Sequence, residues 1–156
     1  MKRIKLSFMI ILSILVASIL LFGLTACDSE GVTKDGFEYQ IRNGIVRLTA
    51  YNGEESQVTV PKKIKTRPVK DLYETFSLNE GITSVTLPQG LETIGQYAFS
   101  GTNISEITIP DSVRTIGISA FSSTHLTEIE IPNGVKTIER GAFEGCAYLE
   151  SVTLSD

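Results

Sequence analysis

The chain has few of the residues that build metal centres, disulfide frameworks and histidine-dependent active sites. Its 156 residues include two cysteines, one histidine and no tryptophan. Two cysteines cannot form a disulfide framework, and one histidine adds too few ligands for a Cys/His zinc site. A catalytic triad has only His125 to draw on. We therefore expect no cofactor, no metal site and no enzymatic activity, with a carboxylate-dependent hydrolase as the remote alternative.

Positive charge is also scarce once the first residues are set aside. Lys2, Arg3 and Lys5 are three of the 14 basic residues and the only charged residues before Cys27. The rest of the chain has 11 basic and 18 acidic residues, a net charge of −7. A chain this acidic has no general attraction for phosphate backbones or anionic lipid. The composition argues against nucleic-acid binding and against polybasic membrane docking.

The N-terminus has the pattern of a targeting segment. A basic stretch precedes 19 uncharged residues, 6–24, which predicts membrane insertion. An uncleaved transmembrane anchor remains an alternative, because the run is long enough to span. The following Leu24-Thr25-Ala26-Cys27 resembles a bacterial lipobox. That resemblance implies that residues 1–26 are a lipoprotein signal peptide and that Cys27 carries the lipid. Residues 27–34 would then be a lipidated cysteine and short tether, holding the protein in the bacterial cell envelope outside the cytoplasm.

The remainder of the chain repeats itself. Pro88, Pro110 and Pro132 lie 22 residues apart. Phenylalanines recur at intervals of 23, 22 and 22 residues, at Phe76, Phe99, Phe121 and Phe143. Each copy places aliphatic residues where a short strand would point them inward, and stacked copies would align equivalent residues in columns. We predict a mainly β solenoid of about four repeats over 62–156, with short parallel strands stacked at a 22–23 residue period.

The repeat unit also points to a family. The pattern L-x-x-I-x-I-P, followed by V-x-x-I-G and then A-F, resembles the BspA-like leucine-rich repeats of bacterial surface proteins. The resemblance implies a right-handed solenoid that binds other proteins, commonly at cell surfaces and in adhesion. In that family the position three residues after the phenylalanine is often cysteine, and Cys146 occupies it here. Because Thr102 and Thr124 hold the same column, we expect a packed corner residue there, not a reactive thiol.

Residues 35–61 are predicted to form an N-terminal antiparallel β cap. Two alternating segments, 37–42 and 45–51, flank Asn43-Gly44, a dipeptide suited to the positive φ angles of a type I′ hairpin turn. A third segment, 57–60, follows another expected turn. At the other end Ser155 replaces the proline that usually follows the strand, and nothing covers that strand. Two alternatives remain open: a truncated array, or self-association through the C-terminal edge.

Acidic and hydroxyl side chains alternate on the outer face of the longer strands. The candidate binding strip comprises Glu106, Thr108, Glu128, Glu130 and Thr153. It is interpreted either as a solvated face or as a site for a basic partner or a divalent ion. Calcium needs six to eight converging oxygens, which a flat sheet rarely supplies, so a protein or peptide ligand is the better hypothesis.

The sequence thus predicts a lipid-anchored, extracytoplasmic leucine-rich-repeat module for noncovalent protein binding or cell-surface adhesion. The alternative is an envelope-resident structural or interaction module with a wall or membrane partner. The short tether supports this alternative, because residues 28–34 span at most ~25 Å and would keep the module near its membrane. Four stacked copies add only ~20 Å.

Overall fold

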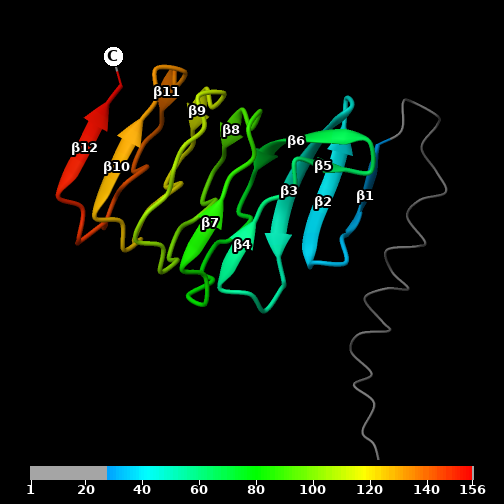
Figure 1. The fold of residues 1–156 in the computed structure, drawn as a ribbon, viewed down its shortest axis with the longest axis horizontal. Coiled ribbons are helices and arrows are strands. Elements are labelled where there is room, and N and C mark those ends of the chain that lie inside the picture. Colours follow the sequence, from blue (N-terminus) through cyan, green and yellow to red (C-terminus); the bar gives the residue numbers. More distant parts are fainter. Residues whose placement is uncertain (1–27, 156) are drawn as a thin grey trace, which may run out of the picture.

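The computed structural model describes residues 28–155 as a solenoid of about five turns (Figure 1). Twelve short strands make up the regular structure of this part of the chain. Within it no helix is long and apolar enough to cross a membrane. The expected signal peptide, residues 1–26, and the lipidation site at Cys27 lie outside the described residues.

Three antiparallel strands form the N-terminal end. The hairpin of β2 (Phe37–Arg42) and β3 (Ile45–Tyr51) is confirmed, with Asn43 and Gly44 at φ values of 50° and 79° in its turn. A strand that was not predicted, β1 (Ser29–Val32), pairs antiparallel with β2. The expected tether is therefore partly folded, because four of its residues are held in the sheet.

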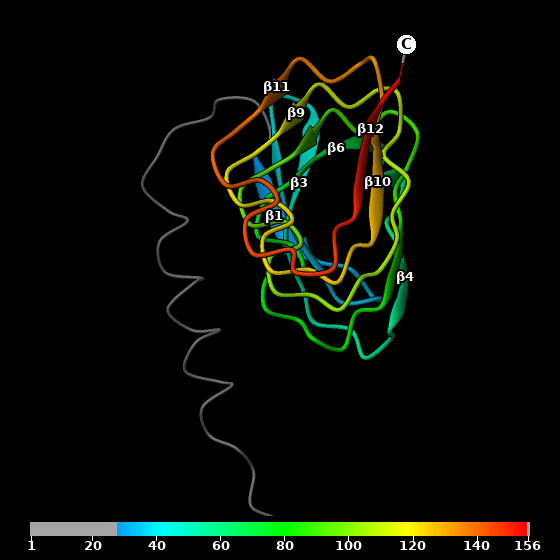
Figure 2. The ribbon, with the colours of Figure 1, turned by 90° about the vertical axis from the view of Figure 1, so that its left-hand side faces the viewer.

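Beyond the hairpin the chain coils between two β walls that face each other across the core (Figure 2). The first wall continues the N-terminal sheet: β3 pairs in parallel with one strand of the next coil, and each following strand pairs in parallel with the strand of the coil after it. These strands are β6 (Arg67–Leu72), β8 (Thr93–Ile94), β9 (Thr115–Ile116) and β11 (Thr137–Ile138). The short strand β5 (Lys63–Ile64) pairs antiparallel with β6 and forms a second hairpin beside the first.

The second wall consists of two separate parallel pairs. They are β4 (Gln57–Thr59) with β7 (Ser84–Thr86), and β10 (Glu128–Ile131) with β12 (Ser151–Leu154). The expectation that the segment at 57–60 adds a strand to the antiparallel cap is wrong. β4 instead pairs parallel with β7 in the next coil, because its alternating side chains, with Val58 and Val60 buried, fit the solenoid wall.

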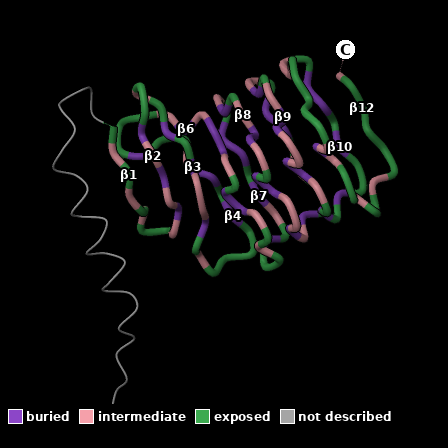
Figure 3. Tube along the Cα trace, turned by 180° about the vertical axis from the view of Figure 1, so that it is seen from behind, coloured by how far each residue is buried: buried purple, intermediate pink, exposed green. Residues whose placement is uncertain are grey.

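A column of phenylalanine rings runs through the core, as the period predicted. Neighbouring centroids lie 5.2, 5.2 and 5.5 Å apart, and the ring planes are 17°, 4° and 1° from parallel. The stacked residues are Phe76, Phe99, Phe121 and Phe143. The first three are fully buried, whereas Phe143 is half-buried in the last coil. Figure 3 shows exposed positions along β12, at this end of the solenoid. At the other end Phe37 packs edge-on against Phe76 at 6.2 Å, so the N-terminal strands cover the column.

Hydroxyl and thiol groups hold the corners after Phe99 and Phe121. Thr102 Oγ1 donates to the Phe99 carbonyl at 2.8 Å, and Thr124 Oγ1 donates to the Phe121 carbonyl at 2.9 Å. Cys146 Sγ donates to the Phe121 carbonyl at 3.0 Å and lies 3.3 Å from Thr124 Oγ1. The thiol thus serves as a corner hydrogen-bonding group.

Candidate binding groove

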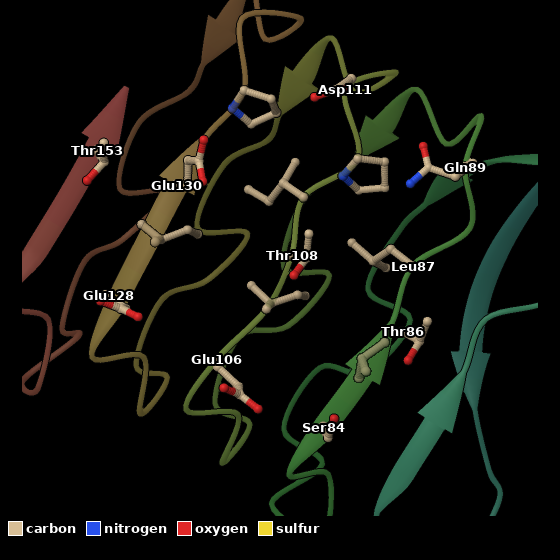
Figure 4. Close-up of a pocket in the computed structure, with 16 residues that line it drawn as sticks. Ser84, Thr86, Leu87, Gln89, Glu106, Thr108, Asp111, Glu128, Glu130 and Thr153 are labelled. Carbon is tan, nitrogen blue, oxygen red and sulfur yellow. The ribbon is translucent and has the colours of Figure 1, made fainter. Parts of the chain in front are cut away.

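A groove of about 780 Å³ runs along the second wall, between β7 and β12. Its lining comes from four successive coils, whose equivalent positions lie side by side (Figure 4). Every member of the predicted binding strip lines this groove: Glu106, Thr108, Glu128, Glu130 and Thr153. All five side chains are exposed, and the four on the segment at 106–109 and on β10 alternate with buried or half-buried aliphatic residues.

The groove lies where the second wall loses its strand pairing. The repeat predicts a continuous ladder from β7 through residues 106–109 to β10, but residues 106–109 form no strand. Among the described residues they make no backbone hydrogen bond, although Thr127 N donates to the Ser105 carbonyl just beside them. A ladder with β10 would set Glu106 directly opposite Glu128, and like charges in that position destabilise strand pairing. The prediction of continuous pairing is therefore wrong in this coil.

The electrostatics of the groove are one-sided. Its lining includes four carboxylates and no lysine, arginine or histidine: Glu106, Asp111, Glu128 and Glu130. Asp111 was not among the predicted residues, although it directly follows the proline that ends the strand segment. One carboxylate is already engaged, since Ser155 Oγ donates to Glu130 Oε1 at 2.6 Å. The groove is thus an anionic surface edged with hydroxyls.

These carboxylates are spread along the groove and do not converge on one point. Within residues 28–155, no three Asp, Glu, His or Cys side chains come together as metal ligands. The lone histidine, His125, is exposed and packs edge-on against Tyr148, with ring centroids 5.0 Å apart. Carboxylates separated in this way can form ion pairs with several cationic side chains of one extended partner. Such pairing is the chemistry that the groove offers.

A family model described as the BspA type leucine-rich repeat region, spanning six copies, matches residues 56–156. The match begins at the coil that contains β4, which agrees with the assignment of that strand to the solenoid. The BspA-type leucine-rich-repeat fold serves as a non-enzymatic scaffold. A search of curated proteins finds no match.

Solved structures share the fold. A leucine-rich repeat protein from Bacteroides capillosus is 24% identical with a TM-score of 0.71, over 80% of this chain and 98% of that one. A leucine-rich repeat protein from T. pallidum is 26% identical with a TM-score of 0.60, over 83% of this chain and 70% of that one. The pneumococcal vaccine antigen PcpA is 20% identical with a TM-score of 0.68, over 85% of this chain and 39% of PcpA. With about two thirds of its residues matched by the family model and its coils stacked in the same way, the chain belongs to the BspA-type leucine-rich repeat family.

Proposed function

We propose that this protein is a lipid-anchored, extracytoplasmic leucine-rich-repeat module whose acidic groove binds a basic segment of another protein. The observation that carries the proposal is the gathering of four carboxylates in a groove lined by no basic side chain. Membership in the BspA-type family supports a module that binds other proteins or works at the surface. Binding would be noncovalent, through ion pairs and hydroxyl hydrogen bonds on a rigid wall.

Rigidity supports useful affinity from a polar surface. The groove walls are held by the coils beneath them, whose core residues Ile129 and Ile109 are buried. A surface that is already ordered loses little conformational entropy when a partner binds. An extended basic peptide would place alternate side chains along the groove, so Glu106, Glu128 and Glu130 would each meet a cation.

A lipid on Cys27 would hold the N-terminal end of the solenoid close to the membrane. Only Asp28 separates Cys27 from β1, because residues 29–32 are paired with β2. This short spacing favours the second candidate function, an envelope-resident module whose partner is another membrane or wall component. An adhesin that must reach a distant surface would need a longer tether. Protease accessibility on intact cells separates the two, because an adhesin is cleaved from whole cells and a wall-buried module is not.

The binding function is tested with a fluorescent oligolysine peptide and fluorescence anisotropy. The variant Glu106→Gln/Glu128→Gln/Glu130→Gln removes three groove carboxylates with little change in shape. Exposed ion pairs contribute about 0.5 kcal/mol each, so three of them amount to about a tenfold loss of affinity. Binding should also weaken as salt is raised, because the surface charges are screened.

A matched control removes the same charge elsewhere. Glu54, Glu55 and Glu80 are exposed and do not line the groove. Their triple substitution to Gln should leave peptide affinity within twofold of the unmodified protein. Equal losses in both triple variants would show that the peptide responds to net charge alone, and the groove would then have no specific role. The electrophoretic and mass-spectrometric signature of acylation at Cys27 tests the anchor separately.

A further inference from the structure

Basic side chains gather at the N-terminal end of the solenoid, opposite in charge to the groove. Seven of the 11 basic residues that follow Cys27 fall within residues 42–70, and no acidic residue occurs from 56 to 70. Six of these seven are exposed, and five of the six, which leaves out the ion-paired Arg47, lie on or beside the two hairpins without a carboxylate partner. We call them the basic cluster: Arg42, Lys62, Lys63, Lys65 and Arg67.

The basic cluster is not neutralised by neighbouring carboxylates. Within the part of the chain that the structure describes, ion pairs join Arg47 to Asp71 at 2.6 Å and Lys70 to Glu92 at 2.8 Å. Those pairs account for the other two basic residues of the segment. The five members of the cluster have no carboxylate oxygen within 4.0 Å among the described residues. Their charge is available to an outside partner.

The two hairpin turns lie next to each other. β3 and β6 pair in parallel with Val46 opposite Val69, so the turn before β3 and the turn before β6 meet at one end of the sheet. A Cβ atom built on Gly44 would lie 3.4 Å from Nη1 of Arg67. Lys65 Nζ sits 5.8 Å from the ring centroid of Tyr39 on β2. Cations from both hairpins therefore form one surface.

The first described strand, β1, also begins at this surface. In the pairing of β1 with β2, Ser29 lies opposite Ile41, directly beside Arg42. Figure 1 shows the start of β1 at the same end of the molecule as the β5–β6 hairpin. The start of β1, and Asp28 directly before it, therefore lie next to the basic cluster. Two carboxylates, those of Asp28 and Glu30, are nearby in sequence and are outnumbered by the five cations.

We propose that the basic cluster docks the N-terminal end of the solenoid on anionic lipid headgroups of the membrane to which the chain is tethered. The inference rests on the proposed lipid anchor, because electrostatic attraction decays within about 8 Å at physiological salt and an anchor at Cys27 would keep the cluster near the bilayer. Each Lys or Arg near an anionic bilayer strengthens attachment about fivefold. The net charge of −7 after Cys27 argued against such docking. That total does not show that seven of the 11 basic residues lie within 42–70.

Docking would orient the module. The groove carboxylates lie several coils away from the basic cluster, on β10 and the segment at 106–109. An anionic bilayer attracts the hairpin end and repels these carboxylates. The solenoid would therefore point away from the membrane, with its acidic groove turned toward the envelope space and open to a basic partner.

The test uses the full chain in nanodiscs of phosphatidylcholine alone or of phosphatidylcholine mixed with phosphatidylglycerol. Hydrogen–deuterium exchange followed by mass spectrometry reports on peptides that cover the two turns, 42–45 and 62–67. We expect exchange there to slow by at least about fivefold in the anionic discs. The variant Arg42→Gln/Lys65→Gln/Arg67→Gln should abolish that slowing. The matched control Arg114→Gln/Lys136→Gln/Arg140→Gln removes the same charge from later coils and should retain it.

Equal exchange in the two kinds of disc would overturn the proposal, and so would loss of the slowing in the matched control. The same slowing on neutral discs with added soluble polyphosphate would assign the surface to a free polyanion and also overturn it. Failure of the anchor is a separate result, because a chain without a membrane attachment would not remain with phosphatidylcholine discs at all. Attachment without a lipid effect on exchange would leave the anchor intact and reject the docking.

Discussion

The rings of Phe99 and Phe121 stack with their centroids 5.2 Å apart and their planes 4° from parallel, and both are fully buried. This spacing is close to the ~4.8 Å between paired β-strands. The ring column and the strand ladder of the first wall therefore advance together from coil to coil. The column is the part of the core that links successive coils. Replacing one of its phenylalanines should therefore lower the stability of the fold by an amount that depends on how deeply that ring is buried.

Truncating the phenylalanine column should destabilise the fold in order of burial. We expect Phe121→Ala to lower the free energy of unfolding by about 4 kcal/mol, because it leaves a large cavity between two rings. Phe143→Ala should cost about half as much, since Phe143 is half-buried and has a ring on one side only. Urea unfolding monitored by circular dichroism measures both. Equal costs would contradict a column that ends at the last coil.

One column of equivalent positions has left-handed backbone conformations, and substitutions there should change the free energy of unfolding. Ser123 and Gly145 occupy equivalent positions in adjacent coils, with φ values of 56° and 72°. Gly145→Ala should cost about 1 kcal/mol of unfolding free energy, because an L side chain is strained there. Ser123→Gly should be neutral or stabilising for the same reason. Its neighbour Ser122 is a matched control: Ser122→Gly should destabilise by about 0.5–1 kcal/mol, since only backbone entropy changes.

The burial of Asp71 should make the stability of the fold depend on pH. Burial raises the pKa of Asp71, and the hydrogen bond and charge of Arg47 oppose that rise. A carboxyl group whose pKa is higher in the folded than in the unfolded state stabilises the fold at low pH. That contribution is lost as pH rises from the ordinary aspartate range through the raised value. Asp71→Asn should remove this slope, as measured by denaturant midpoints over a pH series.

Removing the partner of Asp71 should steepen the fall of stability with rising pH, because Arg47 opposes the rise in the pKa of Asp71. Arg47→Leu leaves a buried carboxylate without its donor and should cost about 2 kcal/mol at neutral pH. The cost should shrink as the pH falls and Asp71 becomes protonated. A cost independent of pH would show that Arg47 acts through packing on the Tyr73 ring, whose centroid lies 5.4 Å from its guanidinium carbon.

The exposed edge of β12 should promote self-association at high concentration. Val152 and Leu154 are 51% and 69% exposed on this strand, which pairs with β10 on one side only within the described residues. Val152→Lys adds a charge to the edge and should lower the association constant, because charged edge residues oppose strand-to-strand pairing. Sedimentation velocity over a concentration series measures this. A strictly monomeric unmodified protein at all concentrations would contradict the expectation.

Several structural features could be predicted because they follow from short-range patterns. The turn at Asn43-Gly44 requires positive φ at both residues, which this dipeptide tolerates well. The strip residues Glu106, Glu128 and Glu130 were found by alternation alone, since neighbouring side chains on a strand point to opposite faces. Asp111 was missed because it follows a proline outside that alternation, and only the coil geometry brings it to the groove.

Sequence by itself determined the repeating unit and the columns, because a 22-residue period places chemically similar side chains at equivalent positions in every coil. Tertiary structure decided which strands pair. β4 joins the solenoid, β1 takes up most of the expected tether, and the ladder is interrupted at residues 106–109. It also decided where charge accumulates, at the groove and at the basic cluster. Strand pairing and local charge depend on contacts between distant segments, and neither a repeat period nor a net charge carries that information.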